Sequence, residues 1–149
     1  MYCYKYPHPA VTADCIVFNK EDKTIKVLLI KRKNEPFKDC WAFPGGFVNI
    51  DESAEDAAIR ELKEETGLEI SGIEQLKAYS DPGRDPRERV ITIAFVAESR
   101  IMEVKGNDDA KEARWFDVSN LPSLAFDHER ILKDAMKRIG GESLLKLYK

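Results

Sequence analysis

The segment SAEDAAIRELKEETG, Ser53 to Gly67, gives the clearest indication of structure in the chain. Ser53 is a favoured N-cap residue, acidic residues occupy the first turn, and Gly67 is a typical residue for the position just after a helix. Ala54, Ala58 and Leu62 recur at helical spacing. The segment therefore predicts an amphipathic helix that packs its apolar side against the rest of the domain.

Three carboxylates crowd the last turns of this helix, at Glu61, Glu64 and Glu65. On a helical wheel Glu61 and Glu65 lie about 40° apart, at the edge of the apolar side rather than opposite it. Partly buried carboxylates are costly unless a partner offsets their charge, and a hard cation such as Mg²⁺ prefers oxygen ligands. The alternative is a solvated face on which Arg60 and Glu64 form an ordinary i,i+4 ion pair.

The segments around this helix predict one α/β or α+β domain built on a mixed sheet. Period-two patterns and β-branched runs predict strands, and a second amphipathic pattern predicts a late helix. The expected strands cover residues 10–19, 24–33, 69–80, 89–99 and 113–118, and the expected helix covers 128–140. Pro-Gly-Gly within WAFPGGFV, residues 41–48, predicts irregular structure, and GNDDAKE, residues 106–112, predicts a polar loop.

Length and composition predict a single folded domain over residues 1–149. Apolar residues make up 43% and charged residues 34% of the chain, as in a globular protein with a charged surface. A formal net charge of −3 gives no general attraction to nucleic acid or anionic lipid, and no apolar run is long enough to cross a membrane. Three separated cysteines and the absence of a signal-peptide pattern predict reduced thiols and a cytoplasmic location.

The region from Gly46 to Leu68 carries a longer motif. It spells G-x5-E-x7-R-E-L-K-E-E-T-G-L, which resembles the Nudix box, G-x5-E-x7-R-E-U-x-E-E-x-G-U with U an aliphatic residue, at each defined position. The preceding WAFPGG resembles the usual lead-in to that box, and the expected elements follow the order seen in the family. The chain is therefore similar to Nudix hydrolases over nearly its whole length.

This resemblance implies an α/β fold, a Nudix-type α/β/α sandwich with a mixed central sheet. It also implies an enzyme that hydrolyses a nucleoside diphosphate linked to another moiety, with Mg²⁺ or Mn²⁺ as cofactor. The metal ligands expected from the motif are Gly46, Glu61, Glu64 and Glu65. Catalytic roles are expected for Arg60, which would orient the carboxylates, and for Glu52 and Glu64. A proton acceptor is expected either on the helix or in the later loop, where the candidates are Asp108, Asp109 and Glu112.

The substrate is suggested by the segment SDPGRDPRERV, residues 80–90, which resembles ADP-ribose-handling Nudix proteins. This favours hydrolysis of ADP-ribose to AMP and ribose 5-phosphate. Arg84 and Arg87, with Arg89, are candidates to bind phosphate or ribose; the alternative is that they pair with Asp81, Asp85 and Glu88 within the loop. Phe37 and Phe43, with Trp41, are candidates to stack on adenine, although such residues are more often part of a core.

Two other functions stay open from the sequence. One is a house-cleaning pyrophosphohydrolase that acts on oxidised nucleoside triphosphates, and the other is a non-catalytic ADP-ribose sensor. Sensors of this family often have a degenerate box and a winged helix, whereas here the box is intact and only GGESLLKLYK follows the late helix. The expected partners are a small nucleotide substrate and a second copy of the chain in a homodimer, with no nucleic acid and no membrane.

Overall fold

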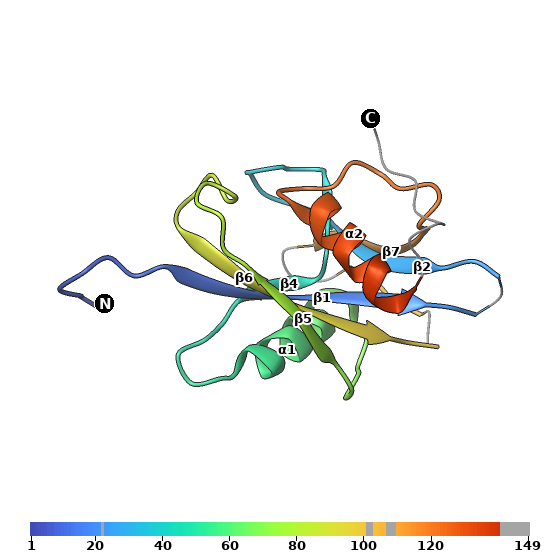
Figure 1. The fold of residues 1–149 in the computed structure, drawn as a ribbon, viewed down its shortest axis with the longest axis horizontal. Helices are drawn as coiled ribbons and strands as arrows, with labels where there is room; N and C mark the ends of the chain where they lie inside the picture. Colours follow the sequence, from blue (N-terminus) through green and yellow to red (C-terminus); the bar gives the residue numbers. More distant parts are fainter. Residues whose placement is uncertain (22, 101–102, 107–109, 141–149) are drawn as a thin grey trace.

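The computed structural model describes residues 1–21, 23–100, 103–106 and 110–140, which form a mixed sheet with a helix on each face (Figure 1). The strands are β1 (Ala10–Asn19), β2 (Lys26–Arg32), β3 (Trp41–Ala42), β4 (Gly45–Phe47), β5 (Glu74–Tyr79), β6 (Val90–Glu98) and β7 (Ala110–Asp117). The helices are α1 (Ala54–Thr66) and α2 (His128–Ile139). The expected α/β/α sandwich is confirmed.

Strand β1 is the centre of the sheet. The strand order is β3-β2-β1-β6-β5, with β4 also paired to β1 and β7 also paired to β2. β1 and β6 run parallel, with Thr12 opposite Thr92, while the other pairs are antiparallel. The first half of β1 lies beside β4, with Asp14 opposite Gly45. This register brings the Pro-Gly-Gly segment next to a charged residue of the central strand.

The alternation of side chains along β1 builds a separate core on each face of the sheet. Ile16 and Phe18 belong to the cluster that includes Leu132 of α2. Cys15 and Val17 belong to the cluster that includes Leu62 of α1. The thiol of Cys15 is buried there, and this burial raises its pKa to about 12, so it stays protonated at neutral pH.

Helix α1 begins and ends as its sequence predicts. The hydroxyl of Ser53 accepts a hydrogen bond from the backbone N–H of Asp56 at 3.1 Å. Gly67 has φ 78°, a left-handed conformation that glycine adopts without penalty, and its N–H donates to the carbonyl of Lys63 at 2.9 Å. Both ends of the helix are therefore fixed by local sequence.

Three expectations were wrong in detail. WAFPGGFV contains two short strands, β3 and β4, because they find partners in β2 and β1. β5 begins only at Glu74, after the glycine at position 72. Glu112 lies within strand β7 rather than in a loop, because this segment pairs with β2. Asp108 and Asp109 lie outside the described residues.

No membrane-crossing helix is found in the part of the chain that the structure describes, since each helix there is too short or too polar.

Candidate active site

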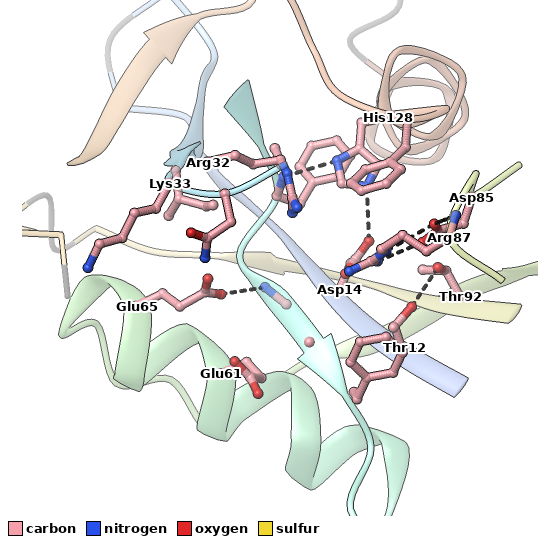
Figure 2. Close-up of a pocket in the computed structure, with 18 of the residues that line it drawn as sticks. Thr12, Asp14, Arg32, Lys33, Glu61, Glu65, Asp85, Arg87, Thr92 and His128 are labelled. Carbon is pink, nitrogen blue, oxygen red and sulfur yellow. Dashed lines mark hydrogen bonds and ion pairs between the residues drawn. The ribbon is translucent and has the colours of Figure 1, made fainter. Parts of the chain in front are cut away.

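A cavity of about 470 Å³ opens between β1, β4, α1, the 80–89 loop and the start of α2 (Figure 2). Its lining brings together residues that are far apart in the sequence. Among them are Asp14, Gly46, Glu61, Glu65, Arg87 and His128. The volume falls in the range typical of small-molecule sites.

The carboxylates of α1 divide into two groups. Glu61 and Glu65 both line the cavity, and Glu65 is only 5% exposed. The Oε1 atom of Glu65 accepts a hydrogen bond from the backbone N–H of Gly45 at 2.8 Å (Figure 2). Glu64 has a side chain that is 44% exposed and does not line the cavity. The structure therefore places two of the three predicted carboxylates in the cavity and the third on its outer side.

Arg60 connects these carboxylates to the loop before the helix. Its guanidinium donates to both oxygens of Glu52, at 3.0 and 2.6 Å, and to Glu61 at 2.7 Å and Glu64 at 3.2 Å. The hydrogen bond from Arg60 is the main reason that the pKa of Glu52 is held below its usual range. The i,i+4 pair expected for a solvated face is thus present, but it is one contact within a larger cluster.

Gly45 and Gly46 let the backbone of β4 approach the carboxylates. A Cβ atom at Gly46 would lie 2.5 Å from the carboxyl carbon of Glu61, and a Cβ atom at Gly45 would collide with Oδ1 of Asp14. At Gly45 the clash also involves the backbone of β1, with the carbonyl oxygen of Ala13 at 2.6 Å, so no side chain fits there. At Gly46 a side chain would displace the carboxylate of Glu61. The two glycines of this segment therefore allow close packing against Asp14 and Glu61.

The residues around Gly46 fit a hard divalent cation. Glu61 and Glu65 offer carboxylate oxygens beside backbone of β4, and Mg²⁺ is usually held by one or two carboxylates with several waters. In the described part of the chain, no three His, Cys, Asp or Glu side chains converge as a complete set of metal ligands. The chemistry of the donors therefore suits an ion that keeps much of its water shell.

The two predicted arginines line the cavity wall, but both are engaged in ion pairs. Arg84 is almost fully buried and donates to both oxygens of Asp127, at 2.8 and 2.6 Å. Arg87 pairs with Asp85 at 3.0 and 2.6 Å, as the alternative interpretation expected. Arg87 keeps a side chain that is 38% exposed, whereas Arg89 is exposed and does not line the cavity.

The aromatic candidates occupy different environments. Phe43 is buried in the cavity wall and stacks on the imidazole of His128, with ring centres 4.8 Å apart. Phe37 is 38% exposed, lies outside the cavity lining and contacts Phe126 with ring centres 4.8 Å apart. Trp41 belongs to the core beneath α2. Of the three, the structure brings only Phe43 to the cavity.

Glu112 does not reach this cavity. Its neighbours in β7, Ala113 and Trp115, pack on the α1 side of the sheet, so alternation places Glu112 on the opposite side. There its carboxylate accepts a hydrogen bond from Arg114 at 2.7 Å. The structure therefore gives no support to Glu112 as the proton acceptor.

Several charged or titratable residues of the cavity were not predicted from sequence, namely Asp14, Arg32, Lys33, Glu35 and His128. Asp14 had a signal that was available: a charged residue in the middle of an otherwise apolar strand needs a reason to be buried. His128 had none, because the first residue of a late helix meets β1 only through the tertiary fold. Thr12 and Thr92, whose hydroxyls are 2.6 Å apart, also line the cavity.

Comparisons with known proteins agree with this geometry. The NUDIX domain family matches residues 8–136. The chain is 54% identical over 132 residues to the ADP-ribose pyrophosphatase of Methanocaldococcus jannaschii, covering 89% of this chain and 76% of that protein. A MutT/nudix family protein from Enterococcus faecalis superposes with a TM-score of 0.86 at 37% identity, over 97% of this chain and 69% of that one. The NUDIX domain of Shewanella oneidensis NrtR, solved with ADP ribose, has a TM-score of 0.84 at 30% identity over 90% of each chain.

The family match covers most of the chain, and the glutamates of α1 lie where its motif requires them. The chain belongs to the Nudix hydrolase family and is similar to the ADP-ribose pyrophosphatases within it.

Proposed function

We propose that the chain hydrolyses ADP-ribose to AMP and ribose 5-phosphate with Mg²⁺ or Mn²⁺ as cofactor. The observation that carries this proposal is the convergence of Glu61, Glu65 and Gly46 in a cavity of about 470 Å³. The cavity has a size suited to a nucleotide derivative. The similarity to the ADP-ribose pyrophosphatase of M. jannaschii supports ADP-ribose as the substrate.

The residues of α1 and β4 have separate roles in this proposal. Glu61, Glu65 and the backbone of Gly46 would hold the cation, with Glu64 as a further ligand or as the proton acceptor. A bound cation would offset the charge of the diphosphate and favour attack of water at phosphorus. Arg60 keeps Glu61 and Glu64 in fixed positions through its hydrogen bonds.

The proton of the attacking water must go to a base, and the carboxylates beside the cavity are the groups suited to accept it. Glu52 is fully engaged by Arg60 and by the N–H of Asn49, at 2.9 Å, so its role is to anchor Arg60. The proposal therefore assigns the base to α1. Glu64 is the first candidate, because it is the most exposed of Glu61, Glu64 and Glu65 and stands at the outer side of the cavity.

The cavity wall supplies the groups that would meet the substrate. Arg87 is partly exposed there and can contribute positive charge toward the diphosphate, although Asp85 offsets part of it. Arg84 is buried against Asp127, so its role is to fix the 80–89 loop to the start of α2. Phe43 forms part of the wall behind the site.

A substrate panel tests the proposal. The purified chain is assayed with ADP-ribose, ADP-glucose and an oxidised guanosine triphosphate, with and without Mg²⁺, and the products are identified by chromatography. We expect AMP from ADP-ribose, the highest kcat/KM for that substrate, and no turnover without a divalent cation. A preference for the triphosphate would establish the house-cleaning function instead, and tight ADP-ribose binding without turnover would establish a sensor.

The assembly and location of the chain stay predictions. We expect a homodimer, which sedimentation equilibrium tests, and a cytoplasmic location, which cell fractionation tests. We expect no binding to duplex DNA in a gel-shift assay, because the net charge of −3 disfavours contact with phosphates.

A further inference from the structure

Asp14 is a buried carboxylate in the cavity that the proposed metal site does not use. It lies in the central strand β1, its side chain is 9% exposed, and it lines the cavity opposite α1 (Figure 2). A charged group in such a place is costly unless it is hydrogen-bonded or serves a ligand. Asp14 therefore needs a polar partner, and the structure supplies one for only one of its two carboxylate oxygens.

That partner is His128, whose orientation is fixed on three sides. The backbone N–H of Phe43 donates to Nδ1 of His128 at 3.2 Å, so the imidazole proton resides on Nε2. Nε2 faces Oδ2 of Asp14 at a distance of 3.3 Å. The ring also stacks on Phe43, and its side chain is only 6% exposed. His128 thus holds Asp14 in one orientation.

The other oxygen of Asp14, Oδ1, is available to a ligand. It sits against the bare Cα of Gly45, where any side chain would cover it. The described residues make no hydrogen bond to Oδ1, and in that part of the chain no fully buried side-chain oxygen lacks a partner. Oδ1 is therefore open to the cavity.

The chemistry of this oxygen restricts what it can bind. A carboxylate repels phosphate groups, but it accepts hydrogen bonds from hydroxyls, and acidic side chains recognise ribose hydroxyls in this way in other nucleotide sites. The paired hydroxyls of Thr12 and Thr92 line the same cavity. We infer that Asp14, oriented by His128, accepts a hydrogen bond from a ribose hydroxyl of the substrate and so selects sugar-bearing diphosphates. This inference rests on the proposed function.

The test removes the hydroxyl and the carboxylate separately. The substrates are ADP-ribose, an analogue that lacks a hydroxyl on the terminal ribose, and an analogue that lacks the 2′-hydroxyl of the adenosine. The variants are Asp14→Asn, His128→Gln and the control Asp81→Asn, which changes an exposed aspartate outside the cavity lining. The measured quantity is the ratio of kcat/KM for ADP-ribose to that for each analogue.

We expect wild type to prefer ADP-ribose over one analogue by roughly 10- to 100-fold, the range for a hydrogen bond to a charged group. In Asp14→Asn the amide oxygen accepts from His128 and an NH₂ group faces the cavity, so this ratio falls toward one. His128→Gln lowers the ratio partly, because Asp14 loses its orientation. Asp81→Asn keeps the wild-type ratio.

Equal kcat/KM for wild type on all three substrates would overturn the inference, even if Asp14→Asn does not fold. A loss in Asp14→Asn that is equal for all substrates and accompanied by a higher Mg²⁺ requirement would assign Asp14 to the metal site instead. If wild type does not hydrolyse ADP-ribose, the proposed function fails. The affinities of wild type and Asp14→Asn for the same three compounds, measured by calorimetry, then test separately whether Asp14 binds a ribose hydroxyl.

Discussion

Gly46 illustrates how a single residue without a side chain can decide the geometry of the site. Its Cα lies against the carboxyl group of Glu61, so the substitution Gly46→Ala would place a methyl group 2.5 Å from the Glu61 carboxyl carbon. Either Glu61 or β4 must then move, and we expect kcat to fall roughly 100-fold or more, because displacement of a reacting group by about 1 Å has this effect.

The matched control for that substitution is Gly72→Ala, since a Cβ atom at Gly72 meets nothing within 4 Å and its backbone is unstrained. Circular dichroism and steady-state kinetics are measured for both variants. Full activity in Gly46→Ala would show that the position of Glu61 does not matter for turnover.

Glu65 is the most buried of Glu61, Glu64 and Glu65, and its carboxylate accepts a hydrogen bond from the backbone N–H of Gly45 in β4. We expect Glu65→Gln to lower kcat/KM by roughly 100-fold or more, because charge stabilisation by a metal is worth several kcal/mol. The variant should also lose the rise in Tm that Mg²⁺ gives the wild type, since a ligand that binds only the folded state stabilises it.

Thermal unfolding with and without Mg²⁺ measures the second effect independently of activity. The control is Glu69→Gln. Glu69 lies just beyond the end of α1, is exposed, pairs with Lys63 and does not line the cavity. The same Mg²⁺-dependent rise in Tm for wild type and Glu65→Gln would exclude Glu65 as a metal ligand.

At the scale of elements, the pair formed by Arg60 and Glu52 fastens helix α1 to the loop that precedes it. The same arginine donates to the carbonyl of Phe47 at 3.2 Å, so it also reaches the end of β4. Helix α1 and strand β4 therefore hold the proposed metal ligands in a fixed relation to each other. This explains why an arginine belongs at this position of the motif even though it does not line the cavity.

The Glu52–Arg60 pair predicts a specific dependence of stability on pH. Arg60 holds the pKa of Glu52 below its ordinary value of 4.5, so the folded state binds this proton less readily than the unfolded state. The stabilisation is thus fully present above about pH 4.5 and is lost as the pH falls through the lower, folded-state pKa. We expect the Tm difference between wild type and Glu52→Gln to be constant near pH 7 and to shrink below about pH 4.5.

Differential scanning calorimetry across this pH range makes the measurement. Glu103→Gln, at an exposed site outside the cavity lining, serves as the control and should show no such change. A Tm difference for Glu52→Gln that stays constant to pH 3 would mean that the pair does not stabilise the fold.

At the scale of the whole molecule, each helix closes a core on its own face of the sheet. Leu132 of α2 is fully buried in one of these cores, together with Phe18 and Ile16 of β1. We expect Leu132→Ala to lower the free energy of unfolding by about 2–5 kcal/mol, the usual cost of such a cavity. Urea denaturation measures it.

Lys133→Ala is the control, since Lys133 is the exposed neighbour on the same helix, and it should change stability by about 0.5 kcal/mol or less. An effect of Leu132→Ala as small as that of the control would contradict the two-core description.

Much of the architecture was predictable because its causes are local. The caps at Ser53 and Gly67, and the apolar positions between them, fix α1 by interactions within a few residues. In β6, alternate side chains point to opposite faces of the sheet, so the sequence of this one strand predicts which residues enter which core. The short strands β3 and β4 were missed because each has only two or three residues and Pro44 and two glycines interrupt any strand pattern. They exist because β2 and β1 offer them hydrogen bonds.

Local patterns along the chain were enough to predict the family, the mixed sheet between two helices, and the placement of Glu61 and Glu65 at the edge of a buried helix face. Three features became evident only once the chain was folded. Asp14 and His128 meet across the cavity, Arg84 pairs with Asp127 rather than within its own loop, and Glu112 lies on the face of the sheet opposite α1. The physical reason is range: helix caps and periodicity act over a few residues, whereas contacts between β1 and α2 depend on how strands pair and helices pack.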